Sequence, residues 1–194
     1  MTKNSPLFFD TDCLSAFLWV GEEALLPQLF PGRIVIPEVV YEELSYPTIR
    51  HLKDRVDSLV AQGKVVLQDI STDPDSEEFP LYQRLTTVNA SDRPAIGRGE
   101  AAAIAMAKVQ NGILASNNLR DISIYVKEFN LRHETTGSIM KQALDAGMIT
   151  EEQGNEIWAR MRAKKRRLGA NSFTDFLNQS RSTTRLLNNR ACMV

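Results

Sequence analysis

The stretch that decides the fold is Leu7-Phe8-Phe9-Asp10-Thr11-Asp12-Cys13-Leu14. Its first three residues form a short apolar run, which is typical of a buried strand. Asp10 stands at the carboxyl end of that strand, and Asp12 is predicted to cap the helix that follows over 13–19. Because a buried carboxylate costs free energy unless something compensates it, Asp10 is predicted to have a function.

Short apolar runs and helical patterns alternate outward from this stretch. Four further strands are predicted, at 33–36, 64–67, 113–116 and 131–133. Helical patterns lie between them, and Asp, Pro and Gly residues mark 89–99 as a loop. Strands that alternate with helices predict a doubly wound α/β fold with a parallel sheet. Two more helices, over 136–146 and 150–165, are predicted to close the chain.

Charge is distributed unevenly along the 194 residues. The formal net charge is -1, but residues 160–194 carry nine bases and one acid, a net +8, which leaves -9 on residues 1–159. The α/β alternation also ends near Gly147. The sequence therefore predicts two parts: an α/β domain over 1–147 and a basic, helical C-terminal extension over 148–194, whose end, 180–194, is expected to be loose.

Several classes of protein are excluded by composition. No apolar run approaches the ~20 residues of a membrane span, and the N-terminus does not resemble a signal peptide, so no membrane partner is expected. Two cysteines, Cys13 and Cys192, and two histidines, His51 and His133, lack zinc-site spacing. Few cysteines suit a reducing compartment, and a cytoplasmic location is expected.

Acidic side chains follow the predicted strands. Asp10 ends the first strand, Glu42 and Glu43 follow the second, Asp121 follows the fourth, and Glu100 opens a helix. In open α/β sheets the active crevice lies beyond the carboxyl ends of the strands. Grouped carboxylates favour hard cations such as Mg²⁺ or Mn²⁺, which can activate water against a phosphodiester. The alternative is that each acid is structural, as a helix cap, a partner of the helix dipole or a solvated residue.

Four blocks of the sequence together resemble the PIN-domain family, in its bacterial and archaeal branch related to VapC-type toxins. The blocks are FFDTDCL at 8–14, IVIPEVVYEEL at 34–44, GRGEAAAIA at 97–105 and ILASNNLRD at 113–121. The resemblance implies a PIN-like three-layer sandwich, in which helices flank a central parallel sheet. It also implies an endoribonuclease that uses Mg²⁺ or Mn²⁺ to cleave single-stranded RNA, with an antitoxin protein and a second copy of the chain as partners.

The resemblance assigns metal ligands residue by residue. They would be Asp10, Glu43 and Glu100, with Glu43 matching better than Glu42, and a fourth ligand at Asn118. The family has an acid at that fourth place, so this sequence departs from the pattern. An amide carbonyl can still bind a metal but adds no charge, and Asp121, one turn further, is expected to supply the missing acid. The expected catalytic set is therefore Asp10, Glu43, Glu100 and Asp121.

Nucleic-acid contacts are expected at two places. Ser116 matches a small hydroxyl residue of the family pattern that could hold a phosphate or a water molecule. The other place is a run of bases: Arg162, Lys164, Lys165, Arg166 and Arg167. Two alternatives stay open for these bases, which are compensation of a helix dipole and docking onto the acidic body of a second subunit.

Two other functions compete with the ribonuclease. The first is a catalytically weakened PIN-like module that binds RNA or protein, because Asn118 lacks the expected charge. The second is a haloacid-dehalogenase-type phosphatase with Asp10 as nucleophile and Asp12 as general acid. The absent Gly-Thr after Asp12, and Asn117-Asn118 where acids are needed, weigh against the phosphatase.

Overall fold

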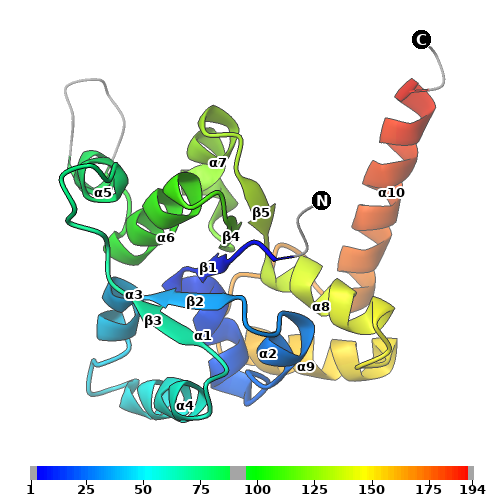
Figure 1. The fold of residues 1–194 in the computed structure, drawn as a ribbon. Helices are drawn as coiled ribbons and strands as arrows, with labels where there is room; N and C mark the ends of the chain where they lie inside the picture. The colour runs from blue at the N-terminus through cyan, green and yellow to red at the C-terminus, as the bar shows by residue number, and fades with distance from the viewer. Residues whose placement is uncertain (1–3, 88–94, 192–194) are drawn as a thin grey trace.

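Five parallel strands form one central sheet in the computed structural model, which describes residues 4–87 and 95–191, with side chains in the last helix as far as residue 182 (Figure 1). The strands are β1 (Leu7–Phe9), β2 (Ile34–Pro37), β3 (Val66–Gln68), β4 (Ile113–Ala115) and β5 (Arg132–Glu134). Their order is β3-β2-β1-β4-β5. The chain runs from β1 out to β3, then returns to the other side of β1, so the strand order reverses between β1 and β4.

Helices cover both faces of this sheet, which confirms the predicted three-layer arrangement. They are α1 (Thr11–Val20), α2 (Leu25–Leu29), α3 (Glu38–Glu43), α4 (Arg50–Ala61), α5 (Glu78–Thr86), α6 (Arg98–Val109), α7 (Leu119–Glu128), α8 (Thr136–Asp145), α9 (Glu151–Ala163) and α10 (Phe173–Ala191). Within the described ranges, no helix is both long and apolar enough to span a bilayer. The loop predicted at 89–99 lies partly outside the described residues; 95–97 is non-helical, and α6 begins at Arg98.

One prediction about the chain's end is wrong. Residues 180–191, expected to be loose, continue α10 as helix. The polar side chains here are compatible with a helix, because the hydroxyls of Ser180 and Ser182 donate to the carbonyls of Phe176 and Asn178 one turn earlier. The start of the helix is anchored by Phe173 and Leu177, which are buried.

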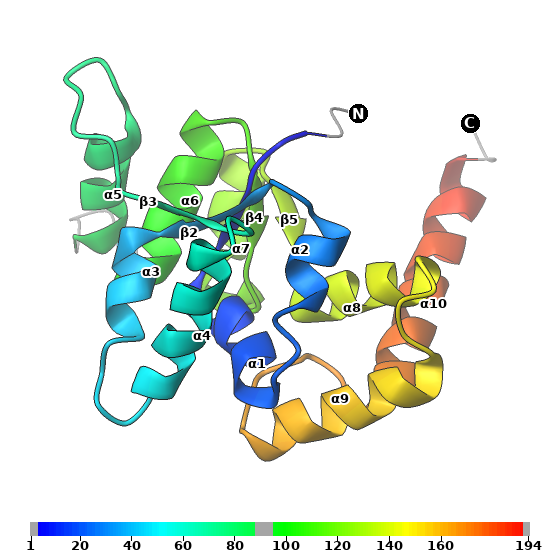
Figure 2. The same cartoon turned by 60° about the horizontal axis from the view of Figure 1, so that its bottom comes forward.

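Alternating side chains of β1 divide the core into two layers. Leu7 and Phe9 belong to the cluster formed with α1, α4, α8 and α9, whereas Phe8 points into the cluster formed with α6 and α7. This alternation is the two-residue period of a strand, and all three side chains are fully buried. Both layers are visible in Figure 2, where α1, α4 and α9 lie on the opposite side of the sheet from α6. β1 is thus the centre of the fold.

Core packing continues across the predicted boundary at residue 147. Trp158 of α9 and Phe173 of α10 are fully buried and belong to the same cluster as Leu7 and Phe9. The rings of Trp158 and Phe173 lie 5.8 Å apart. The division into 1–147 and 148–194 stays a prediction about how the chain is organised. In the packed protein, α8, α9 and the start of α10 form part of one hydrophobic core.

Gly154 permits the close contact between α9 and α10. A Cβ atom at this position would overlap the ring of Phe173. In an unobstructed helix, Ala is favoured over Gly by about 1 kcal/mol. Whether Gly154→Ala stabilises or destabilises the chain therefore depends on the contact with Phe173. Gly154→Ala is expected to destabilise the chain by about 1–3 kcal/mol, the usual cost of overpacking a core.

Urea denaturation measures this effect. Glu156→Ala, at an exposed position of the same helix, is the matched control and is expected to change stability by less than about 0.5 kcal/mol. A Gly154→Ala protein as stable as the native chain would show that α10 does not pack on α9 as described.

Candidate active site

The carboxyl ends of β1 and β4 lie side by side where the strand order reverses. Phe9 pairs with Ala115 in the sheet, and the N–H of Asp10 donates to the Ala115 carbonyl at 2.9 Å. Asp10 therefore leaves β1 next to Ser116, which leaves β4. In open α/β sheets this topological switch point is where ligands bind. The geometry places the candidate site here.

Asp10 is the buried acid of this site, with no exposed surface. Its Oδ1 atom accepts a hydrogen bond from the N–H of Cys13 at 2.7 Å and caps α1. The predicted cap, Asp12, is wrong: Asp12 lies in the first turn of α1. The other oxygen of Asp10, Oδ2, is buried and has no hydrogen-bond partner among the described residues. A buried acceptor without a partner is costly.

The electrostatics of Asp10 follow from this burial. Loss of solvation raises the pKa of Asp10 from 3.8 to about 7, although the nearby Ser116 hydroxyl and the Cys13 N–H lower it. The charges of Asp12 and Glu100 raise the pKa of Asp10 further. Asp10 is therefore poised to bind either a proton or a cation at neutral pH.

Glu100, Asn118 and Asp121 meet through one side-chain amide. The Nδ2 atom of Asn118 donates to Oε1 of Glu100 at 2.6 Å and to Oδ2 of Asp121 at 2.7 Å. Glu100 also accepts from the N–H of Gly97 at 3.3 Å. Burial raises the pKa of Glu100, and its hydrogen bond from Asn118 lowers it. The amide of Asn118 thus holds together two acids that would otherwise repel each other.

Glu43, rather than Glu42, faces the start of α6. Oε1 of Glu43 accepts from the N–H of Gly99 at 3.0 Å, and Oε2 accepts from the Thr11 hydroxyl. A Cβ atom at Gly99 would stand 2.9 Å from Oε2 of Glu43, so only glycine allows this approach. Glu42 is exposed and pairs with Arg98 at 3.5 Å. Glu43 therefore contacts the direct neighbours of Asp10 and Glu100.

The donor set suits a hard divalent cation. It consists of carboxylate and amide oxygens only, and Asp10 contributes a buried oxygen with no hydrogen-bond partner in the described part of the chain. In the described part of the chain, however, no three His, Cys, Asp or Glu side chains already stand close enough to hold a metal ion. Glu100 and Asn118 bond to each other instead, through Nδ2 of Asn118. The residue types fit a metal site that forms when the ion binds.

Ser116 lies inside the protein. Its side chain is buried, and its hydroxyl accepts from the N–H of Asn118 at 3.3 Å. The imidazole of His133 contacts the Ser116 carbonyl at 2.8 Å. These contacts fix the segment after β4, which carries Asn118.

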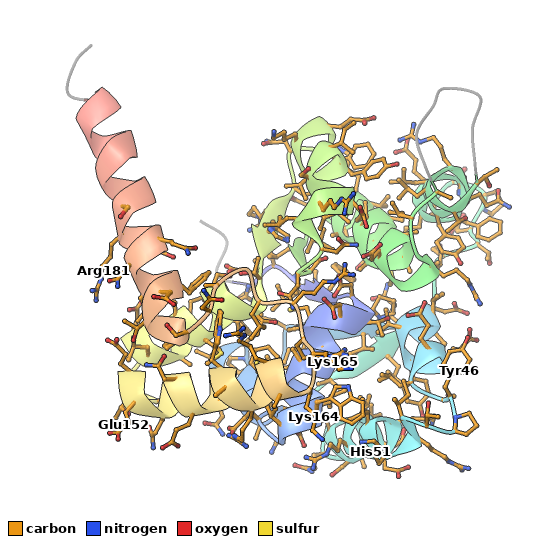
Figure 3. All side chains as sticks on the ribbon, turned by 180° about the vertical axis from the view of Figure 1, so that it is seen from behind. Tyr46, His51, Glu152, Lys164, Lys165 and Arg181 are labelled. Carbon is orange, nitrogen blue, oxygen red and sulfur yellow. The ribbon has the colours of Figure 1, made fainter. Side chains whose placement is uncertain are left out.

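Much of the basic segment at the end of α9 contacts the protein itself. Arg162 donates to the carbonyl of Asn171 at 2.7 Å, and the ammonium group of Lys164 lies 5.2 Å from the centre of the Trp19 ring. Lys165 and Arg167 are exposed. Arg166 reaches Asp12 of α1 at 3.7 Å. The segment therefore lies against α1, and Figure 3 shows Lys164 and Lys165 at the end of α9 on that side.

Thr11 was missed by sequence reasoning, and Asp12 was considered only as a helix cap and as the general acid of a phosphatase. Thr11 bonds to Glu43, and the charge of Asp12 acts on both Asp10 and Glu100. The Asp-Thr-Asp pattern directly after a buried strand was the signal that could have found them. One helical turn brings both residues to the edge where β1 ends.

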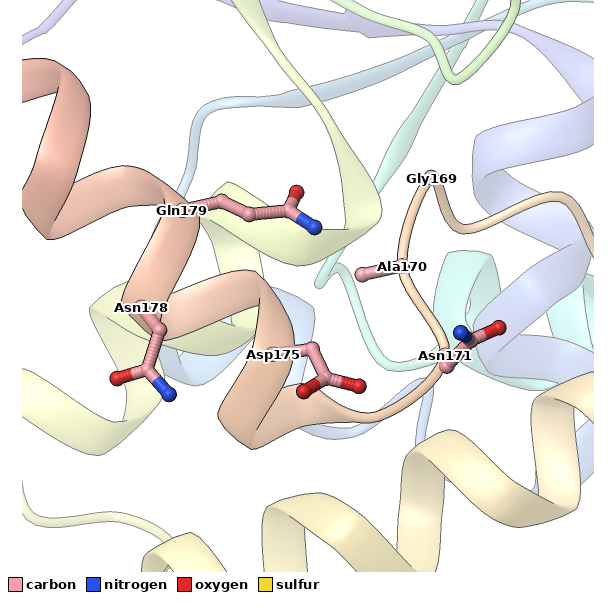
Figure 4. Close-up of a pocket in the computed structure, with 6 residues that line it drawn as sticks. All are labelled: Gly169, Ala170, Asn171, Asp175, Asn178 and Gln179. Atoms are coloured by element: carbon pink, nitrogen blue, oxygen red, sulfur yellow. The ribbon is translucent and has the colours of Figure 1, made fainter.

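A polar cavity of about 600 Å³ lies elsewhere, between the segment after α9 and the first turns of α10. Figure 4 shows Asp175, Asn178 and Gln179 of α10 opposite Gly169, Ala170 and Asn171. None of the acids of the candidate site lines it. This cavity is separate from the carboxyl edge of the sheet.

Fold and site together define a class, an α/β protein with acids gathered at the switch point of a parallel sheet. A family model described as a PIN domain matches residues 7–182, and the chain therefore belongs to the PIN-domain family. PIN domains are in general nucleases, and they generally use divalent metal ions.

Two individual proteins are similar to parts of the chain. A phosphoribosylformylglycinamidine synthase subunit of Granulibacter bethesdensis is 37% identical over 79 residues, which is 40% of this chain and 11% of that protein. The chain thus spans about a tenth of that relative's length. The crystal structure of VapBC2 from Rickettsia felis, bound to a promoter DNA fragment, aligns with a TM-score of 0.48 and 18% identity, over 66% of this chain and 97% of that one.

Proposed function

We propose that this PIN domain is an endoribonuclease that cleaves single-stranded RNA with Mg²⁺ or Mn²⁺. The observation that carries the proposal is the buried carboxylate of Asp10 at the switch point of the sheet, where one oxygen has no partner among the residues that the structure describes. Such a group is costly in the folded protein unless a ligand uses it. The phosphatase alternative is set aside because the chain belongs to the PIN-domain family.

Residues of this chain would hold the metal in a defined way. Asp10 and Glu100 are the proposed ligands, with the amide oxygen of Asn118 and the carboxylate of Asp121 beside them. A bound divalent ion supplies a water molecule of lowered pKa and stabilises negative charge on the phosphate. Glu43, expected from the sequence to be a metal ligand, already accepts from Gly99 and Thr11; we propose that it holds the start of α6, and hence Glu100, in place.

The basic segment is proposed to attract the RNA strand. An acidic crevice repels phosphates, so a nuclease needs cations near its rim. Lys165 and Arg167 are exposed, and Arg162, Lys164 and Arg166 come from the same segment. Ser116 is proposed to position Asn118 rather than to touch the phosphate, because its side chain is buried.

A second candidate function is an RNA- or protein-binding module with weakened catalysis. The observation that favours it is the Asn118 amide, which donates to both Glu100 and Asp121. The amide N–H groups between these two acids already offset part of their mutual repulsion, as a cation would. The amide also adds no negative charge that would attract a cation. This candidate predicts salt-sensitive RNA binding without cleavage.

An antitoxin protein and a second copy of the chain are the proposed protein partners. Both follow from the family resemblance of the four sequence blocks. Arrest of bacterial growth on expression of the native chain is the test of toxin status.

Cleavage of a labelled single-stranded RNA separates the two candidates. The purified chain is expected to cut the RNA in Mn²⁺ or Mg²⁺ and to leave it intact in EDTA. Gel analysis over a time course measures the rate. RNA that binds but remains intact with every divalent ion would contradict the nuclease and support the binding module.

A further inference from the structure

Arg166 occupies a particular place among the bases of the C-terminal part. It follows α9, yet its guanidinium returns to the first turns of α1: Nη1 lies 3.7 Å from Oδ1 of Asp12 and 3.3 Å from the Ser15 hydroxyl. Its Nε donates to the Lys164 carbonyl at 3.0 Å. These contacts hold the guanidinium beside Asp12, which is two residues after Asp10 in the chain.

Asp12 connects this guanidinium to the acids of the site. Its carboxylate raises the pKa of both Asp10 and Glu100, so it lies within electrostatic reach of both. Burial raises the pKa of Asp12, and Arg166 and Arg167 lower it. The contacts with Asp12 and Ser15 place Arg166 at the first turns of α1, directly after Asp10 in the chain.

The contact between Asp12 and Arg166 is weak enough for a phosphate to replace Asp12. At 3.7 Å it is longer than a hydrogen bond, and both side chains are partly exposed, 31% for Asp12 and 25% for Arg166. A partly exposed ion pair of this length contributes little to stability. A phosphate, which arginine binds in bidentate fashion, would bond more strongly to the same guanidinium.

We propose that Arg166 binds a phosphate of the RNA strand beside the first turn of α1, next to the acids of the candidate site, and that Asp12 is the positioning residue which holds the guanidinium there until RNA displaces it. This inference rests on the proposed function for its substrate. It separates Arg166, which faces the acid Asp12, from Arg162 and Lys164, which contact the Asn171 carbonyl and the Trp19 ring. In this proposal Asp12 positions a guanidinium and does not bind the metal ion.

The test measures RNA binding without cleavage. A fluorescent single-stranded RNA of about twelve nucleotides is titrated in EDTA, by anisotropy, at several salt concentrations. Each phosphate neutralised on a single strand contributes about 0.7 to the slope of log affinity against log salt. Arg166→Gln is expected to reduce the slope by about 0.7, whereas Arg166→Lys, which keeps the charge, should retain the slope and lose part of the affinity.

Arg181→Gln is the matched control. It removes one exposed positive charge on α10, away from the crevice (Figure 3), and the slope is expected to stay unchanged. Equal losses for Arg181→Gln and Arg166→Gln would overturn the proposal, since a general field would then explain the binding. An unchanged slope in Arg166→Gln, or no salt-sensitive binding by the native chain, would overturn it as well.

A double-mutant cycle tests the role of Asp12. Asp12→Asn is expected to tighten RNA binding several-fold, because the guanidinium loses its competing partner. Most of that gain should vanish in the Arg166→Gln background. A gain of the same size in both backgrounds would show that Asp12 acts only as a repelling charge.

The outcomes distinguish this inference from the nuclease itself. An Arg166-dependent slope together with no cleavage in Mn²⁺ would support the inference and contradict the nuclease. Cleavage in Mn²⁺ with an Arg166-independent slope would do the reverse. Far-UV circular dichroism of each variant shows whether the fold is retained.

Discussion

The Asp10→Asn protein is expected to lose metal-dependent RNA cleavage by about three orders of magnitude or more. The carboxylate removed is the buried one, of which one oxygen has no partner within residues 4–87 and 95–191, so its loss removes a charged ligand from the centre of the site. The replacement is nearly isosteric, and its amide oxygen can still accept from the N–H of Cys13. Single-turnover cleavage in saturating Mn²⁺ measures the loss. Retention of more than a tenth of the native rate would exclude Asp10 as a metal ligand.

The same substitution is expected to stabilise the metal-free chain at alkaline pH. Asp10 has a folded-state pKa of about 7, above the value of 3.8 for an exposed carboxyl. The folded protein therefore holds a proton between pH 4 and 7 that the unfolded chain has released. The free energy of unfolding of the native chain should fall as pH rises from about 4 to about 7 and then level off.

Asp10→Asn should remove this contribution to the pH dependence. At pH 4 the variant and the native chain should be similarly stable, because Asp10 is then neutral. At pH 8 the variant should be more stable by about 4 kcal/mol, since the pKa of Asp10 is raised from 3.8 to about 7 and each pKa unit corresponds to about 1.4 kcal/mol. Urea denaturation in EDTA at both pH values measures the difference. Equal stability at pH 8 would contradict the high folded-state pKa.

Mn²⁺ provides a readout that does not depend on catalysis. At pH 8 the ion is expected to raise the Tm of the native chain, because ligand binding to the folded state stabilises it. Asp10→Asn should abolish that rise. Glu42→Gln, at the exposed acid that pairs with Arg98, is the matched control and should keep the full rise.

Asn118→Asp has the second large expected effect. The substitution replaces the donor that bonds to Glu100 and Asp121 with a third acid. Without metal the three carboxylates would repel one another, so the Tm in EDTA should fall by several degrees. With metal they add charge to the donor set, and the affinity for Mn²⁺ should rise at least about tenfold. Cleavage at low Mn²⁺ should rise with it.

Asn118→Ala separates the two causes. It removes the same hydrogen bonds and adds no charge, so it should lower the Tm in EDTA and leave Mn²⁺ affinity unimproved. If Asn118→Asp bound Mn²⁺ no better than the native chain, position 118 would not belong to the metal site. Cleavage that appears only in Asn118→Asp would favour the weakened binding module over the nuclease.

Much of the fold could be predicted from local pattern. The apolar run Leu7–Phe9 is β1, the centre of the sheet, and the alternation of strands and helices predicted the parallel α/β sheet. The end of α10 could not be predicted in this way, because 180–191 is polar. Its helical state depends on hydrogen bonds within the helix and on the anchoring of Phe173 and Leu177.

The sequence predicted which residues lie at the site but not which of them contact one another. Strand ends placed Asp10 and Asn118 at one edge because parallel strands share their carboxyl ends, and Glu100 was placed by its helix start. The sequence could not decide between Glu42 and Glu43, since both lie in one turn of α3. The tertiary structure places Glu43 against the start of α6, because the N–H of Gly99 donates to it, and leaves Glu42 exposed beside Arg98.

The sequence by itself determined three properties: which segments are buried, which acids follow them, and that the C-terminal part is basic. Only the tertiary structure decided what each charge faces. Arg166 lies 154 residues from Asp12 along the chain, and no periodic pattern links them. Their contact exists because α9 packs on α1, and packing between distant helices depends on side-chain shape across the whole core.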